Sequence, residues 1–97
     1  MNKLVEILKH YGLKINRNGV CYGIAYGFVD AQLQGQKEAS RWYNLHTKVI
    51  AYPGSMAQLA DTLKNQSREN TDPRGIFSDR ELLLLPAFLE TIHMYMS

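Results

Sequence analysis

Glycine recurs at every fourth position, at Gly19, Gly23 and Gly27, inside a segment that otherwise has the residue pattern of a helix. Residues four apart lie on the same face of a helix, so the three glycines form one stripe. Each interior glycine costs about 1 kcal/mol relative to alanine, and the stripe therefore needs a structural reason. We infer that another backbone approaches closely there, either from a neighbouring helix or from a bound segment.

Helical periodicity covers most of the chain and predicts an all-α fold. Apolar residues recur at helical spacing over 2–11, from about 20 to 34, over 36–51, from 55 to about 64, and from 78 to the end. A strand over 20–29 is the alternative for the second segment, because this stretch contains β-branched and aromatic residues. The polar residues that follow it argue for a helix. We expect a single domain over residues 1–97, with four or five helices around a central glycine-lined helix.

Turn residues separate these segments. Gly12 is placed to end the first helix in a left-handed turn, and Gly35 marks a break between the second and third helices. Residues 52–54, with the sequence Tyr-Pro-Gly, predict a turn. The polar stretch 65–75 predicts a surface loop.

Capping residues mark the start of the last two helices. Ser55 and Ser78 are each followed three residues later by a partner that completes a capping-box pattern, Gln58 and Glu81 respectively. Pro86 falls within the last helical pattern. We expect it to kink that helix or to split it in two, because proline removes a backbone hydrogen bond.

Charge and composition exclude several classes of partner. The 11 basic and 9 acidic residues give a net charge of +2 and form no basic run, so we expect no nucleic-acid partner. The longest apolar run, 82–85 with its continuation past Pro86, is far shorter than the ~20 residues that span a bilayer. Three unclustered histidines and one cysteine lack the spacing of metal ligands, and no cofactor is expected. A single cysteine cannot form an internal disulfide, which fits a reducing, cytoplasm-type compartment.

Cys21 lies where the second helix begins and is the candidate nucleophile. A thiol at a helix N-terminus faces unpaired backbone N–H groups and the positive end of the helix dipole, which stabilise a thiolate. The thiolate is the nucleophile in cysteine catalysis. The structural alternative makes Cys21 a small buried residue on an apolar stripe with Ile24 and Phe28, and free cysteine is among the most buried residue types.

Other catalytic groups are less clearly marked. The turn formed by Asn16, Asn18 and Gly19 offers backbone and amide donors for an oxyanion. His46 and His93 are candidate bases, although neither lies in a setting that distinguishes it.

Two tyrosines, Tyr22 and Tyr26, lie one helical turn apart in the second helix. Aromatic residues in a chain of this size are mostly core residues with their hydroxyl groups at the rim. An exposed Tyr22–Tyr26 pair would instead mark a surface for a protein partner.

The segment NGVCYGIAYGF, residues 18–28, resembles the nucleophile helix of papain-like cysteine proteases secreted by bacterial pathogens. It is still more similar to the N-terminal segments of Legionella- and Coxiella-type secreted effectors, which often carry G-x-C-x-G-[LI]-[AS]. Those segments are followed by helices, by a motif similar to LLPAFLETIHMYMS here, and by further domains such as ankyrin repeats. The resemblance implies Cys21 as the nucleophile and 16–19 as the oxyanion region, with the catalytic His and Asp or Asn in a following β-rich half.

Nothing in residues 1–97 has the pattern of that β-rich half, and the last helical pattern reaches the terminus without a stop signal. We therefore expect the chain to be the N-terminal part of a longer protein.

Our first hypothesis is a non-catalytic helical interaction module of a bacterial secreted effector, translocated into a host cell and bound to a protein partner. The second is the helical, nucleophile-bearing half of a papain-like cysteine protease or acyl-transfer enzyme, with the His and Asp half of that fold absent from residues 1–97. The third is an ordinary regulatory or structural helical protein. Substrate and oligomeric state are left open.

Overall fold

The computed structural model describes residues 2–16, 18–64 and 75–96, and in these parts it contains five helices and no strand. The all-α prediction is confirmed, and the strand alternative for 20–29 is wrong because this segment is helical throughout. Except for Gly75, the stretch 65–75 that we predicted to be a loop lies outside the described residues. The helices are α1 (Asn2–Tyr11), α2 (Val20–Gln34), α3 (Gln36–Ala51), α4 (Met56–Lys64) and α5 (Asp79–Tyr95).

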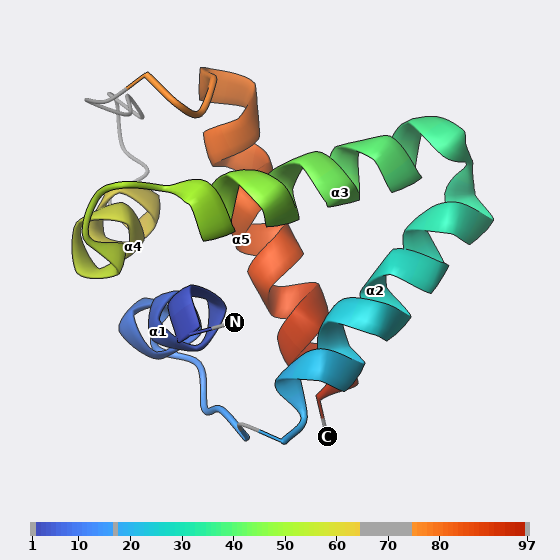
Figure 1. The fold of residues 1–97 in the computed structure, drawn as a ribbon, viewed down its shortest axis with the longest axis horizontal. Coiled ribbons are helices and arrows are strands. Elements are labelled where there is room, and N and C mark those ends of the chain that lie inside the picture. Colours follow the sequence, from blue (N-terminus) through green and yellow to red (C-terminus); the bar gives the residue numbers. More distant parts are fainter. Residues whose placement is uncertain (1, 17, 65–74, 97) are drawn as a thin grey trace.

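The helices form two groups (Figure 1). α2 and α3 diverge from Gly35 as the two arms of a V, and α5 packs against both of them. α1 and α4 lie side by side and close the other side of the fold. Gly35 has a φ of 130°, a backbone conformation that L side chains rarely adopt, so the predicted break between α2 and α3 is confirmed.

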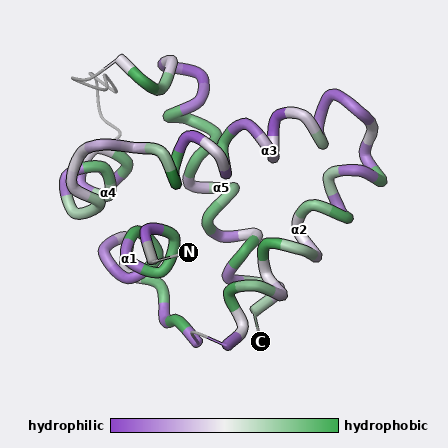
Figure 2. The backbone as a smooth tube through the Cα atoms, in the orientation of Figure 1, coloured by the Kyte–Doolittle hydropathy of each residue, from purple (hydrophilic) through white to green (hydrophobic). Residues whose placement is uncertain are grey.

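The core is continuous through both groups. Figure 2 shows hydrophobic residues along most of α5, which begins with a short hydrophilic stretch. α5 connects the V of α2 and α3 to the pair of α1 and α4, since it packs on α2 and α3 and also contacts α4. The core side chains that are almost completely buried are Leu4, Ile7 and Leu8 of α1, Val20 of α2, Val49 of α3, Leu59 and Leu63 of α4, and Leu82, Leu85, Leu89 and Ile92 of α5.

Helix ends follow the predicted turn and capping residues. Gly12 has a φ of 98°, and its N–H donates to the carbonyl of Lys9 at 2.9 Å, which ends α1 in a left-handed turn. The Ser55 hydroxyl accepts hydrogen bonds from the N–H groups of Ala57 and Gln58 at 3.1 and 3.4 Å. Local residue chemistry is therefore sufficient to place these ends.

Pro86 does not split the last helix, and that part of our prediction is wrong. α5 runs without interruption from Asp79 to Tyr95 through the proline. Leu85 before it and Phe88 and Leu89 after it are buried in the same core. Burial of these side chains on both sides of the proline offsets the hydrogen bond that the proline cannot make.

Glu81 fixes the start of α5 and joins it to α3. Its N–H donates to the Ser78 hydroxyl at 3.1 Å, and its carboxylate accepts the Ser78 N–H at 2.9 Å, so the predicted capping box is confirmed. The same carboxylate accepts two hydrogen bonds from Lys48 Nζ of α3, at 2.7 and 2.8 Å. Partial burial would raise the pKa of Glu81, but the hydrogen bonds from Lys48 and Ser78 outweigh it and hold the pKa below its usual value.

We expect Glu81→Gln to lower the free energy of unfolding by about 1 kcal/mol at pH 7, because glutamine retains the cap but loses the ion pair. A carboxylate with a depressed pKa stabilises the fold above its unfolded pKa, and this contribution is lost as pH falls through the folded value. The difference between wild type and variant should therefore shrink between pH 5 and pH 3, about the range in which a glutamate titrates.

Urea denaturation at pH 7, 5 and 3 measures this effect. Glu38→Gln is the matched control, because the Glu38–Arg41 pair is a more exposed i,i+3 contact on one helix and should contribute less than about 0.5 kcal/mol. Equal destabilisation by the two variants would contradict a special role for Glu81.

Candidate functional site

The glycine stripe of α2 lies against α5. A Cβ atom added at Gly19 would overlap the carbonyl oxygen of Met96, and one added at Gly23 would overlap that of Ile92. The backbone of α5 thus lies directly on α2, with no room for a side chain between them. The close approach that we inferred from the glycine spacing is made by a neighbouring helix.

The third glycine of the stripe makes room for a tryptophan. A Cβ atom at Gly27 would overlap the indole ring of Trp42, which extends from α3. Trp42 is 9% exposed, and its ring packs on Phe88 of α5 with 4.5 Å between centroids and 55° between planes. Its indole N–H is buried and has no hydrogen-bond partner among the described residues. Trp42 therefore fills the angle between the two arms of the V.

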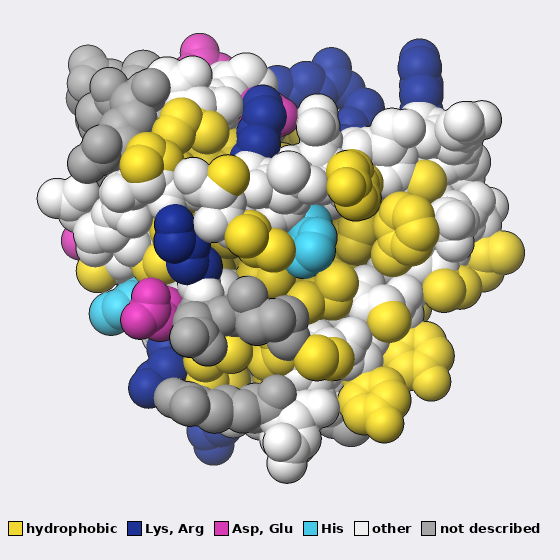
Figure 3. Space-filling view, in the orientation of Figure 1, with side chains coloured by type: hydrophobic (Ala, Val, Ile, Leu, Met, Phe, Trp, Pro, Cys, Tyr) yellow, Lys and Arg dark blue, Asp and Glu magenta, His cyan; other side chains and the backbone are white. Residues whose placement is uncertain are grey.

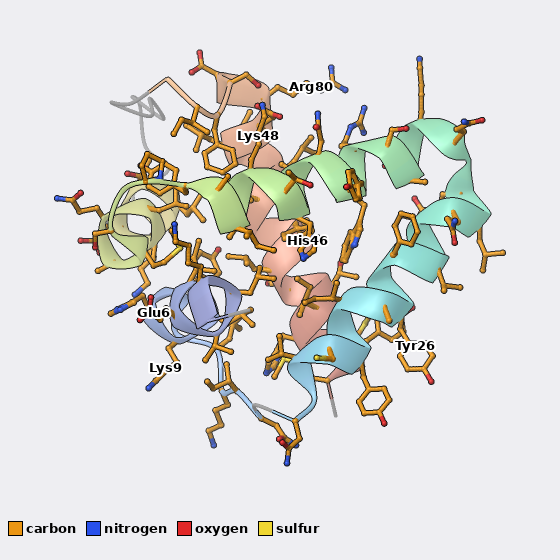
Figure 4. The ribbon with its side chains drawn as sticks, viewed as in Figure 1. Glu6, Lys9, Tyr26, His46, Lys48 and Arg80 are labelled. Carbon is orange, nitrogen blue, oxygen red and sulfur yellow. The ribbon has the colours of Figure 1, made fainter. Side chains whose placement is uncertain are left out.

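A second face of α2 is apolar and exposed. Tyr22, Tyr26, Val29 and Leu33 are 62%, 53%, 48% and 83% exposed, and their spacing places all four on one side of the helix. We call these four residues the outer face of α2. Figure 3 shows hydrophobic side chains projecting along the edge of the molecule over α2, and Figure 4 shows Tyr26 pointing away from the other helices.

The outer face is ordered by aromatic contacts and almost free of charge. The rings of Tyr22 and Tyr26 stack with 6.3 Å between centroids, and Tyr26 lies 6.2 Å from the ring of Tyr95 on α5. Asp30 is the single charged residue of α2, and its carboxylate accepts a 3.4 Å hydrogen bond from Gln34 of the same helix. Of the two alternatives for the tyrosine pair, the exposed position is the one observed.

Cys21 is exposed to solvent, so the interpretation of this residue as part of the core is wrong. Ile24 and Phe28, expected to be buried beside it, are only partly buried. The buried face of α2 is turned toward the glycines, because only they allow α5 to approach. Cys21 comes two residues before Gly23 and therefore lies about 160° from it around the helix. A reagent can reach its thiol.

The turn before α2 uses its hydrogen-bonding groups internally. The N–H of Asn18 donates to the side-chain oxygen of Asn16 at 3.0 Å, and the N–H of Gly19 donates to the carbonyl of Asn16 at 2.8 Å. Both of these backbone donors are occupied. An oxyanion hole formed by these two N–H groups would require a different conformation of the turn, and the side-chain amides of Asn16 and Asn18 as oxyanion donors stay a prediction.

The histidines lie apart from Cys21. His93 of α5 lines a pocket of about 310 Å³ together with Asn16, but Cys21 is not among the residues that line it. His46 is partly buried and points from α3 toward the middle of the molecule (Figure 4), and its burial lowers its pKa. Within the described part of the chain, no hydrogen bond joins either histidine to the thiol. The structure therefore brings together one candidate base and one candidate turn residue without the nucleophile.

A pocket of about 210 Å³ lies between α2, α3 and α5, with Gly27, Trp42 and Phe88 in its lining. Arg41 and Glu38 also line it, but they are bonded to each other at 2.8 Å. This ion pair is satisfied within the protein, whereas the indole N–H of Trp42, which also belongs to the lining, is a buried polar group without a partner among the described residues.

Two further classes of site are absent from the described residues. Over 2–16, 18–64 and 75–96, no three side chains of the types His, Cys, Asp or Glu come together as metal ligands would. In the same ranges no helix has both the length and the hydrophobicity needed to cross a bilayer.

Neither a family model, nor a curated protein, nor a solved structure matches this chain. The candidate site must therefore be judged on its own geometry. The outer face of α2 is then the candidate site, because it is a row of four large apolar side chains exposed to solvent.

Sequence reasoning found half of this surface. Tyr22 and Tyr26 were candidate interaction residues, whereas Val29 and Leu33 were not recognised. Their spacing is the signal that could have identified them, since positions 22, 26, 29 and 33 follow helical intervals on a face separate from the glycines.

Proposed function

We propose that this chain is a non-catalytic helical module that binds a protein partner through the outer face of α2. The observation that carries the proposal is a row of four large apolar side chains that the fold leaves in solvent. If each fully exposed side chain of these types offers about 150–250 Å², their exposed fractions amount to roughly 400–600 Å². That is the size of the largest apolar patch on a typical monomer, and such patches are often functional.

The chemistry of the face favours a helix as the bound element. Anchor residues at helical spacing are what an amphipathic helix presents to its partner, and tyrosine is enriched in protein interfaces. Stacking of Tyr22 on Tyr26, and of Tyr26 beside Tyr95, limits the freedom that these side chains lose on binding. The resemblance to secreted bacterial effectors stays a prediction, and it would place the chain inside a host cell.

A displayed library of amphipathic helical peptides tests the proposal. We expect it to yield peptides that bind the folded chain with micromolar affinity and bind the Tyr26→Glu variant at least tenfold more weakly, because a carboxylate would have to be buried. Leu83→Glu is the matched control, because Leu83 is 58% exposed on α5 outside the outer face and its substitution should leave binding unchanged. Peptides that bind Tyr26→Glu as well as wild type would contradict the proposal.

The second candidate is the nucleophile-bearing half of a cysteine protease or acyl-transfer enzyme, and the exposure of Cys21 is the observation that favours it. We expect iodoacetamide to alkylate Cys21 in the folded chain at a rate within about threefold of the rate in denaturant, since the thiol is open to solvent. Mass spectrometry across pH 5 to 9 measures both rates.

The pH profile of alkylation decides between the two functions. A folded-state rate that levels off well below pH ~8.5, where a free cysteine titrates, would support an activated nucleophile. A profile equal to that in denaturant supports the non-catalytic module. Reaction only after unfolding would contradict the exposed position of Cys21.

A further inference from the structure

The spacing of the outer face is symmetrical. Its four residues, Tyr22, Tyr26, Val29 and Leu33, are separated by four, three and four residues, so the pattern reads the same in both directions along α2. The midpoint lies between Tyr26 and Val29. A surface that is complementary to itself about a twofold axis is the requirement for an isologous dimer.

We propose that a second copy of this chain binds the outer face of α2 through its own outer face, with the two α2 helices antiparallel. The proposal rests on the proposed function and names its partner. In this arrangement Tyr22 of one copy lies opposite Leu33 of the other, and Tyr26 lies opposite Val29. Each tyrosine thus meets a smaller aliphatic side chain, whereas a parallel pair would place tyrosine on tyrosine at the same level. Intervals of four and three residues are those of knobs-into-holes packing.

Charge allows this pairing. Asp30 is the single charged residue of α2, and the twofold axis places it opposite Ala25 of the second copy rather than opposite the other Asp30. No like charges within the two α2 helices meet, and no opposite charge has to be supplied by a different protein. A helix of another protein would find no charged residue on the outer face to define its orientation.

The area predicts a weak dimer. Two faces of roughly 400–600 Å² each bury about 800–1,200 Å² in total, which is the range of weak and transient interfaces. Tyr95, whose ring lies beside that of Tyr26, borders the contact and adds to it. We therefore expect a dimer that dissociates in the micromolar range, in reversible equilibrium with the monomer.

Sedimentation velocity over a concentration series tests the dimer. We expect wild type to associate, Leu33→Glu to weaken the association at least tenfold, and Leu83→Glu to leave it unchanged. Circular dichroism confirms that each variant is folded. A wild-type chain that stays monomeric to about 1 mM would overturn the second copy as the partner. Binding of selected peptides to that monomer would show that the proposed function survives without the dimer, and loss of both would overturn both.

Disulfide trapping tests the orientation. In a Cys21→Ser background, the single variants Tyr22→Cys and Leu33→Cys are oxidised mildly, alone and as a mixture. The antiparallel pair predicts cross-linked dimers mainly in the mixture. Two copies of position 22 would be about 16 Å apart along the axis, whereas a disulfide requires Cα atoms within about 7 Å. Cross-linking of each variant alone but not of the mixture would overturn the antiparallel arrangement.

Discussion

Replacing Trp42 with alanine is expected to lower the free energy of unfolding by about 3–5 kcal/mol. The indole ring is the contact among α2, α3 and α5, since it packs on Phe88 and fills the space left by Gly27. Alanine would leave a cavity at the junction of three helices, and the glycine backbone opposite has no side chain that could move into it. A domain of this size is stable by about 5–15 kcal/mol, so the loss is a large fraction of the total.

Urea denaturation followed by circular dichroism measures this loss. Tyr43→Ala is the control, because Tyr43 is the next residue in α3, is also aromatic and is 63% exposed. Its substitution should change stability by less than about 0.5 kcal/mol. Similar losses for the two variants would show that Trp42 does not join the helices as described.

Substituting alanine for Gly23 is expected to destabilise the protein by about 2 kcal/mol, although alanine is the better helix former. The added methyl group would overlap the backbone carbonyl of Ile92, and a backbone cannot rotate away as a side chain can. α2 and α5 would have to separate, and such overpacking costs more than the ~1 kcal/mol that helix propensity returns.

The sign of the change makes this experiment decisive. Ala25→Gly, at an exposed position of the same helix, should cost about 1 kcal/mol from propensity alone. If Gly23→Ala stabilises the chain by that amount instead, α5 does not lie on α2 at this position. Chemical denaturation of both variants under the same conditions gives the comparison.

Most of the secondary structure could be predicted because its signals are local. Gly12 and Gly35 end helices through backbone conformations that other residues avoid, and Ser78 with Glu81 forms a cap within one turn. The glycine stripe likewise predicted that a backbone would lie close to α2. It could not predict which helix would supply that backbone, because the partner, α5, is more than 40 residues away in sequence.

The error at Pro86 and the error at Cys21 have a common physical origin. The local cost of a proline was outweighed by apolar burial on both sides of it, which depends on residues from other helices. Cys21 was placed on an apolar stripe by its spacing from Ile24 and Phe28. α2 has two faces that could be buried, the face with these three residues and the face with the glycines. The glycine face lies inward because it has no side chains and lets α5 approach at the shortest distance.

Local patterns in the sequence predicted four or five helices, most of their ends and a close backbone contact at the glycines, since each depends on residues within one or two turns of one another. Which side of α2 meets solvent, in contrast, depends on contacts between helices that are far apart in the sequence. Once α5 and Trp42 cover the glycines, the side of α2 that carries Tyr22 and Leu33 lies in solvent. That choice depends on how α2, α3 and α5 pack together, and packing is a property of the whole chain.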